Sequence, residues 1–129
     1  MSRTLIIAEH DGTNLNPSTS KCASCATALG QDFDIVVMGA STSEIAVQAA
    51  AIDGTGSVIS IDAEHLANPL AAYHASEVVA LGDSYSHILG PSTTYGRDLM
   101  PRIAALLGVN QVSDISAVDG AYRFKRPIY

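Results

Sequence analysis

Thr4-Leu5-Ile6-Ile7-Ala8 is an unbroken apolar run, and Phe33-Asp34-Ile35-Val36-Val37-Met38-Gly39 is a second run with one acidic interruption. Runs of this kind, without polar alternation, are typical of strands buried on both faces of a parallel sheet. A small-residue stretch from about Pro17 to Leu29 lies between them. It follows a capping Asn16, has Pro at its first position and ends before Gly30, which together predict a helix. The order strand, helix, strand predicts a βαβ unit.

The alternation of short apolar runs with stretches of helical period continues along the chain. Two further strands are predicted at residues 57–61 and 87–90. Three further helices are predicted, and each should bury one apolar face. In chain order those faces carry Ile45, Ala49 and Ile52, then Leu70, Tyr73, Val78 and Leu81, and finally Leu99, Ile103, Leu106 and Leu107.

The last of these helices has two possible starts because it contains Pro101. If it begins near Asp98, the missing N–H falls in the first turn and costs little. If it begins near Ser92, Pro101 lies inside the helix and should kink it. Beyond the helix, residues 112–118 and 122–129 are predicted as two strands. Asp119-Gly120 between them is a hairpin signal, so these strands are expected to be antiparallel.

The whole pattern predicts a single α/β domain over residues 1–129. We expect a three-layer, Rossmann-like, mostly parallel sheet with helices on both faces and antiparallel strands at the carboxyl-terminal end. The formal charge of −6 argues against nucleic-acid binding and against attraction to anionic lipid. No apolar run approaches the roughly 18 residues of a membrane span. Without a secretion signal at its start, the chain is expected in the cytoplasm.

Cys22 and Cys25 have the C-x-x-C spacing of redox proteins. A reactive thiolate needs a position near a helix amino terminus, where the helix dipole lowers its pKa. Cys22 instead falls more than one turn inside its predicted helix, so we expect both thiols to be inert. Zinc needs about four ligands, and the scattered histidines offer no second pair, so no metal site is predicted.

The segment after the fourth predicted strand is the best candidate for an anion site. In open α/β sheets ligands bind at the carboxyl ends of strands, and free N–H groups at a helix start favour phosphate. The candidate residues are Ser92, Thr93, Thr94 and Arg97. The segment is not a P-loop, because the glycine spacing differs and Arg97 stands where the lysine would be. Nor is Gly54-Thr55-Gly56 a dinucleotide fingerprint, because it precedes a strand.

His10, between Glu9 and Asp11, is the only candidate general base that stands out. A base also needs a nucleophile and an orienting partner within reach, and the sequence identifies neither. The alternative is a loop whose polar side chains hold its turn. No catalytic residue is therefore predicted.

Four segments together resemble the alpha subunits of electron-transfer flavoproteins. They are residues 5–10 with residues 15–19, the helix segment 96–107, residues 112–115, and the closing residues 124–129. The resemblance covers the chain end to end and implies that it is the amino-terminal domain of such a subunit. It departs from the family at Tyr129, where members continue into a domain that holds FAD.

The resemblance implies a protein that uses FAD to carry electrons from acyl-CoA and related dehydrogenases to a membrane quinone reductase, in fatty acid β-oxidation. The expected partners are a beta subunit, in a heterodimer, and the chain's own FAD domain, which is expected to be absent here. This domain would then be a scaffold with no turnover and no cofactor of its own. The aromatic and aliphatic residues near the carboxyl end, including Tyr122, Phe124, Ile128 and Tyr129, are expected to form part of an interface.

Two other classes of protein are left open. The first is a free-standing adenine-nucleotide-binding module of the universal-stress-protein kind. The glycines at 82, 90 and 96 do not reproduce the phosphate motif of those proteins. The second is a small hydrolase that uses His10.

Overall fold

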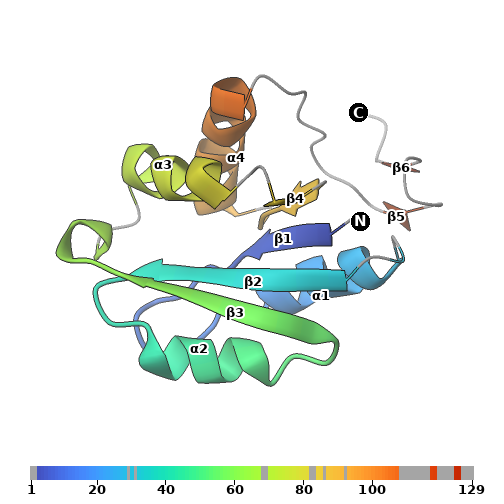
Figure 1. Cartoon of the computed structure of the whole chain (residues 1–129), viewed down its shortest axis with the longest axis horizontal. Helices are drawn as coiled ribbons and strands as arrows, with labels where there is room; N and C mark the ends of the chain where they lie inside the picture. The colour runs from blue at the N-terminus through green and yellow to red at the C-terminus, as the bar shows by residue number, and fades with distance from the viewer. Residues whose placement is uncertain are drawn as a thin grey trace.

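The structure is a computed structural model that describes residues 3–28, 30, 32–67, 70–81, 84–85, 87–91, 93–107, 117–118 and 124–125. Strands and helices alternate along the chain (Figure 1). In order they are β1 (Arg3–Ile7), α1 (Ser18–Ala28), β2 (Asp32–Gly39), α2 (Ser43–Ala50), β3 (Thr55–Asp62), the short 3₁₀ helix η1 (Glu64–Leu66), α3 (Ala71–Leu81), β4 (His87–Leu89), α4 (Thr94–Leu107), β5 (Ala117–Val118) and β6 (Phe124–Lys125).

The first four strands form one parallel sheet in the order β3-β2-β1-β4. β1 is central, with Ile6 opposite Ile35 of β2 and Thr4 opposite His87 of β4. The residues of β1 and β2 that follow the first position are almost all buried, as expected for strands covered on both sides. The predicted α/β class and parallel sheet are therefore confirmed.

Helices cover both faces of the sheet, with α1 and α2 on one side and α3 and α4 on the other (Figure 1). Because successive side chains of a strand point to opposite faces, β1 contributes to both apolar layers. Leu5 and Ile7 pack with α3 and α4, and Ile6 packs with α1 and α2. Burying each such side chain contributes about 1.5–3 kcal/mol. Ala23 and Ala26 of α1 are buried as well, and their small side chains allow α1 to lie close to the sheet.

Two predicted helix faces were wrong in part. Leu70 and Tyr73 at the start of α3 and Leu106 near the end of α4 are about half exposed or more. Val78 of the predicted face is buried as expected, and α3 also buries His74 and Ala75. The sequence pattern selects the largest apolar side chains. The position of α3 in the fold decides which of its faces meets the sheet. The polar His74 can be buried on that face because it has hydrogen-bond partners there.

α4 begins at Thr94, so the later start near Asp98 was wrong and Pro101 lies inside the helix. Pro101 has no N–H to give to the carbonyl of Arg97, one turn earlier. The helix is held despite this loss because Leu99 and Ile103, on either side of Pro101, are buried against the sheet.

At the carboxyl-terminal end, β5 and β6 pair in an antiparallel arrangement, with Ala117 opposite Lys125. This confirms the expected antiparallel strands. They form a two-stranded sheet separate from the main one. The remaining residues of the two predicted strands, including Tyr122, Ile128 and Tyr129, lie outside the described residues, so their expected place in an interface stays a prediction.

Candidate functional site

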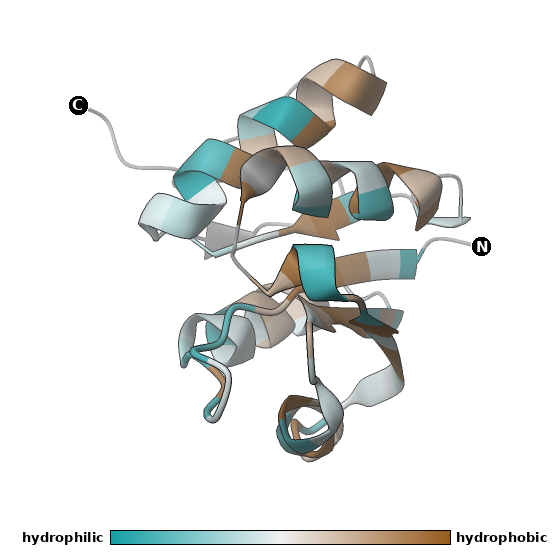
Figure 2. Cartoon of the chain, turned by 90° about the vertical axis from the view of Figure 1, so that its left-hand side faces the viewer, coloured by the Kyte–Doolittle hydropathy of each residue, from teal (hydrophilic) through white to brown (hydrophobic). Residues whose placement is uncertain are grey.

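Between β1 and β4, the helical connections that join the strands switch from one face of the sheet to the other. The connections from β1 to β2 and from β2 to β3 run through α1 and α2 on one face, whereas the connection from β3 to β4 runs through α3 on the other. In open α/β sheets such a switch point is where ligands bind. Figure 2 views the molecule from the side toward which the strands run, with α3 and α4 above the sheet and α1 and α2 below it.

Glu9 follows β1 at this switch point and is half-buried. One carboxylate oxygen, Oε1, accepts a hydrogen bond from the hydroxyl of Thr93, which follows β4. The other, Oε2, accepts a 3.1 Å hydrogen bond from the side-chain amide of Asn16. A single carboxylate therefore joins the loops after two neighbouring strands.

Thr93 and Asn16 are both helix caps. Thr93 Oγ1 accepts the N–H of Gly96 at 3.3 Å, in the first turn of α4. Asn16 Oδ1 accepts the N–H of Ser18 at 2.9 Å, at the start of α1. Such capping satisfies backbone N–H groups that have no partner within the helix.

A second carboxylate holds the residue before α2. Asp62, at the end of β3, accepts the backbone N–H of Thr42 at 3.0 Å and its hydroxyl at 2.5 Å. Thr42 precedes α2 and is buried. The starts of α1, α2 and α4 at this edge are thus all held by the chain's own polar side chains.

The described residues of the predicted anion site lie together at the start of α4 but have different surroundings. Thr93 is engaged by Glu9 and by the first turn of α4. Thr94 and Arg97 are exposed at the start of α4, and the backbone N–H of Arg97 bonds the carbonyl of Thr93 at 2.8 Å. Ser92 lies outside the described residues. The anion site stays a prediction, and Glu9 is a residue of this region that sequence reasoning did not connect to it.

His10 holds its own loop together. Its Nε2 lies 2.7 Å from the carbonyl oxygen of Met38, and its Nδ1 accepts the backbone N–H of Gly12 at 3.0 Å. Because a carbonyl can only accept, Nε2 carries the proton, and both nitrogens of the neutral ring are then occupied. This arrangement matches the alternative reading of His10 as a residue that holds a turn.

The tip of the same loop is also braced. Asp11 Oδ1 accepts the backbone N–H groups of Thr13 and Asn14, and these bonds lower the pKa of Asp11. From α2, the side-chain amide of Gln48 bonds the N–H of Leu15 and the carbonyl of Thr13, each at 2.8 Å. The loop is therefore fixed to a neighbouring helix as well as to itself.

His74 is a buried polar residue that links three elements. Its Nδ1 is 2.7 Å from the hydroxyl of Tyr95 in α4, and its Nε2 is 3.3 Å from the carbonyl of Leu66 in η1. Burial lowers the pKa of His74 and raises the pKa of Tyr95, because it disfavours the charged form of each. The neutral histidine joins α3, α4 and η1, a role that the sequence did not reveal.

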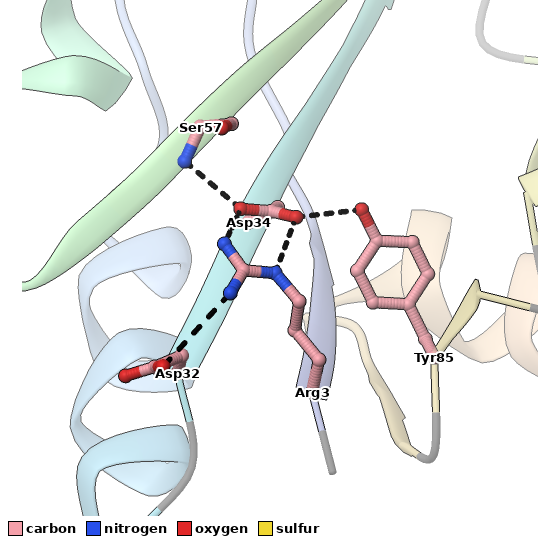
Figure 3. Close-up of polar contacts among 5 residues, drawn as sticks. All are labelled: Arg3, Asp32, Asp34, Ser57 and Tyr85. Atoms are coloured by element: carbon pink, nitrogen blue, oxygen red, sulfur yellow. Dashed lines mark hydrogen bonds and ion pairs between the residues drawn. The ribbon is translucent and has the colours of Figure 1, made fainter. Parts of the chain in front are cut away.

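A buried ion pair lies toward the opposite, amino end of the strands (Figure 3). Asp34 of β2 is only 6% exposed and accepts two hydrogen bonds from Arg3 of β1, at 2.5 and 2.8 Å. The hydroxyl of Tyr85 and the backbone N–H of Ser57 in β3 complete its partners, at 2.8 and 2.9 Å.

The pKa of Asp34 is lowered, chiefly by the hydrogen bond from Arg3. Burial, followed by the bond to Asp34, raises the pKa of Tyr85 to about 12. These residues connect β1, β2, β3 and the segment before β4, at the end of the sheet where ligands do not bind in this fold. We therefore assign the network to the structure of the sheet. Its one sequence signal is the acid that interrupts an apolar strand.

The two cysteines lie as expected for packed thiols. Both are residues of α1: Cys22 is buried, and Cys25, about one turn later, is partly exposed. Burial raises the pKa of both thiols, that of Cys22 to about 12. Neither has the lowered pKa of a reactive cysteine. Among the described residues, no group of three or more His, Cys, Asp or Glu side chains is placed to hold a metal ion. Within the same residues, no helix is long and apolar enough to span a membrane.

The fold and its switch point define this chain as a three-layer α/β domain of the Rossmann-like class. A family model described as "Electron transfer flavoprotein domain" matches residues 4–129. The chain belongs to the electron transfer flavoprotein family.

Curated relatives agree with this assignment. The alpha subunit of Pseudomonas aeruginosa is 39% identical over 125 residues, which cover 97% of this chain and 40% of that protein. The alpha subunit of Paracoccus denitrificans is 39% identical over 97% of this chain and 41% of its own length. The mitochondrial alpha subunit of Dictyostelium discoideum is 35% identical over 99% of this chain and 38% of its own length. This chain thus spans about 40% of these relatives.

The resemblance inferred from the sequence is therefore confirmed. The universal-stress-protein alternative gains no support from these relatives or from the described residues.

Proposed function

We propose that this chain is the amino-terminal scaffold domain of an electron-transfer flavoprotein alpha subunit. With a beta subunit and FAD, the complete protein would carry electrons from acyl-CoA and related dehydrogenases to the respiratory chain. The observation that carries the proposal is the similarity to alpha subunits over 97% or more of the chain. We also propose a cytoplasmic location for this carrier.

The scaffold role means that the domain has no turnover of its own. The occupied nitrogens of His10 and the raised thiol pKa of Cys22 support this view. His10 is engaged in loop structure and Cys22 in packing.

The described residues do not fit a bound flavin dinucleotide. A dinucleotide on this fold would place its pyrophosphate at the switch point, against a helix amino terminus. Here that position holds the carboxylate of Glu9, which would repel a phosphate. We infer that FAD is held by the part of the alpha subunit that these residues do not include.

The proposed partners are the beta subunit and the FAD domain of the same alpha subunit. The exposed apolar residues Leu70, Tyr73 and Leu106 support an interaction role, because Tyr and large apolar side chains are common at protein interfaces. The carboxyl-terminal residues Ile128 and Tyr129 remain part of this proposal.

A reconstitution experiment tests the function. The chain is purified alone, and then mixed with the cognate beta subunit and a separately produced FAD domain. We expect the chain alone to be colourless after gel filtration. In the mixture, it should co-elute with both partners and with FAD, and the complex should accept electrons from reduced acyl-CoA dehydrogenase. The matched control omits only this chain. A chain that remains a monomer and leaves FAD retention unchanged in the full mixture would refute the proposal.

A further inference from the structure

The carboxylate of Glu9 lies between two helix starts that come from opposite faces of the sheet. α1 begins on one face and α4 on the other, and their caps Asn16 and Thr93 each donate a hydrogen bond to Glu9. A helix start carries partial positive charge, so one negative group here interacts favourably with both helices.

The carboxylate also orients both caps. An ionised carboxylate can only accept hydrogen bonds. Because the hydroxyl proton of Thr93 points to Glu9, the lone pairs of that hydroxyl are free to face the N–H of Gly96. Because the amide N–H of Asn16 points to Glu9, its Oδ1 faces the N–H of Ser18. Removal of the carboxylate would leave both caps without this constraint.

We propose that Glu9 is a resident anion, meaning a side chain that permanently fills the place where nucleotide-binding α/β domains hold a ligand phosphate. It closes the switch point to phosphates and fixes β1, α1 and α4 relative to one another. At the end of β3, Asp62 likewise holds Thr42, the residue before α2, through its N–H and its hydroxyl. The inference stands on these contacts alone and does not depend on the family's electron transfer.

Anion rescue of a cavity variant tests the proposal. Glu9→Ala removes the carboxylate and leaves room for a small anion. We expect its equilibrium constant for unfolding to rise roughly tenfold, in line with the loss of charge at two helix starts. Sodium formate or phosphate, at ionic strength matched with chloride, should restore much of the lost thermal stability. Phosphorus NMR should detect phosphate binding to this variant and none to the wild type.

Two further variants serve as controls. Glu9→Gln keeps the volume but turns an N–H₂ group toward one of the two donors, so it should lose stability without rescue. Glu44→Ala removes an exposed acid from the first turn of α2. This variant should lose little stability and should gain none from formate or phosphate.

The proposal is overturned if Glu9→Gln is as stable as the wild type, a result that can be read even if Glu9→Ala does not fold. It is also overturned if a folded Glu9→Ala shows no rescue, or if phosphate stabilises the wild type as much as the variant. Phosphate binding to the wild type at Thr93 and Arg97 would instead favour the anion site predicted from the sequence. None of these outcomes depends on a beta subunit or on FAD, so they are separate from the test of the proposed function.

Discussion

Replacement of Gly96, the one glycine within the described helices, by alanine should destabilise the domain. Gly96 is buried in the first turn of α4, next to the backbone of Pro91, which follows β4. A Cβ atom there would lie 1.7 Å from the carbonyl oxygen of Pro91 and 2.7 Å from its carbonyl carbon. Both are backbone atoms, so no rotation of a side chain can relieve the overlap.

The magnitude follows from two opposing effects. Alanine is a better helix former than glycine by about 1 kcal/mol. Against this, the contact must lengthen by more than about 1 Å, and overpacking of this kind costs about 1–3 kcal/mol and occasionally more. α4 would have to move away from Pro91 while Leu99 and Ile103 remain fixed in the core. We therefore expect a net loss of about 2 kcal/mol, or a Tm lower by roughly 8 °C for a domain of this size.

Gly90→Ala provides the matched control. Its Cβ would meet the sulfur of Met100 at 2.4 Å, but that atom belongs to a flexible side chain that can move away. We expect it to cost clearly less than Gly96→Ala when both are measured by urea unfolding and by thermal melts. If Gly96→Ala is as stable as the wild type, or if Gly90→Ala is the more damaging change, the inferred overlap between a Cβ at position 96 and the backbone of Pro91 is refuted.

Three other changes test the buried groups. Asp34→Asn should lower the free energy of unfolding at neutral pH. The difference from the wild type should shrink as the pH falls below 3.8, the ordinary aspartate pKa, because the native contacts stabilise only the ionised carboxylate. Urea unfolding across that range checks this, and a constant gap would count against it. Tyr95→Phe leaves Nδ1 of buried His74 without a donor and should cost about 1–3 kcal/mol in the same assay, whereas an unchanged stability would contradict the assigned hydrogen bond. In the folded chain Cys22 should resist alkylation, and rapid labelling would argue for a reactive thiol. The double change Cys22→Ser with Cys25→Ser should leave electron transfer by the complete protein intact. Loss of transfer in a folded double variant would argue for a chemical role.

The sequence predicted the elements because their signals are local. Apolar runs, caps and a proline at the start of α1 lie within a few residues of what they specify, and the boundaries of β1, α1 and β2 differ from the prediction by only one or two residues. The start of α4 was also within reach, since the hydroxyl of Thr93 is a capping signal directly before Thr94.

The site could not be predicted in the same way because its contacts are distant in sequence. Glu9 and Thr93 are 84 residues apart and meet only because β1 and β4 are neighbours in the sheet. No local sequence pattern specifies the order of strands in a parallel sheet. The burial of His74 likewise depends on Tyr95, a residue of another helix. Local reasoning therefore found the loops at the carboxyl ends of the strands but not which of their side chains touch.

The central position of β1 has a consequence for the making of the protein. β1 leaves the ribosome well before β4, yet one of its two hydrogen-bonding edges is completed only by β4, whose His87 pairs with Thr4. At roughly 5–20 residues per second, synthesis of the intervening chain takes roughly 4–17 s. During that interval the apolar edge of Leu5 and Ile6 remains open to other nascent chains. Slow translation or crowded ribosomes should therefore harm this domain more than its modest size suggests, and chaperones that bind apolar strands should act on it before residue 87 emerges.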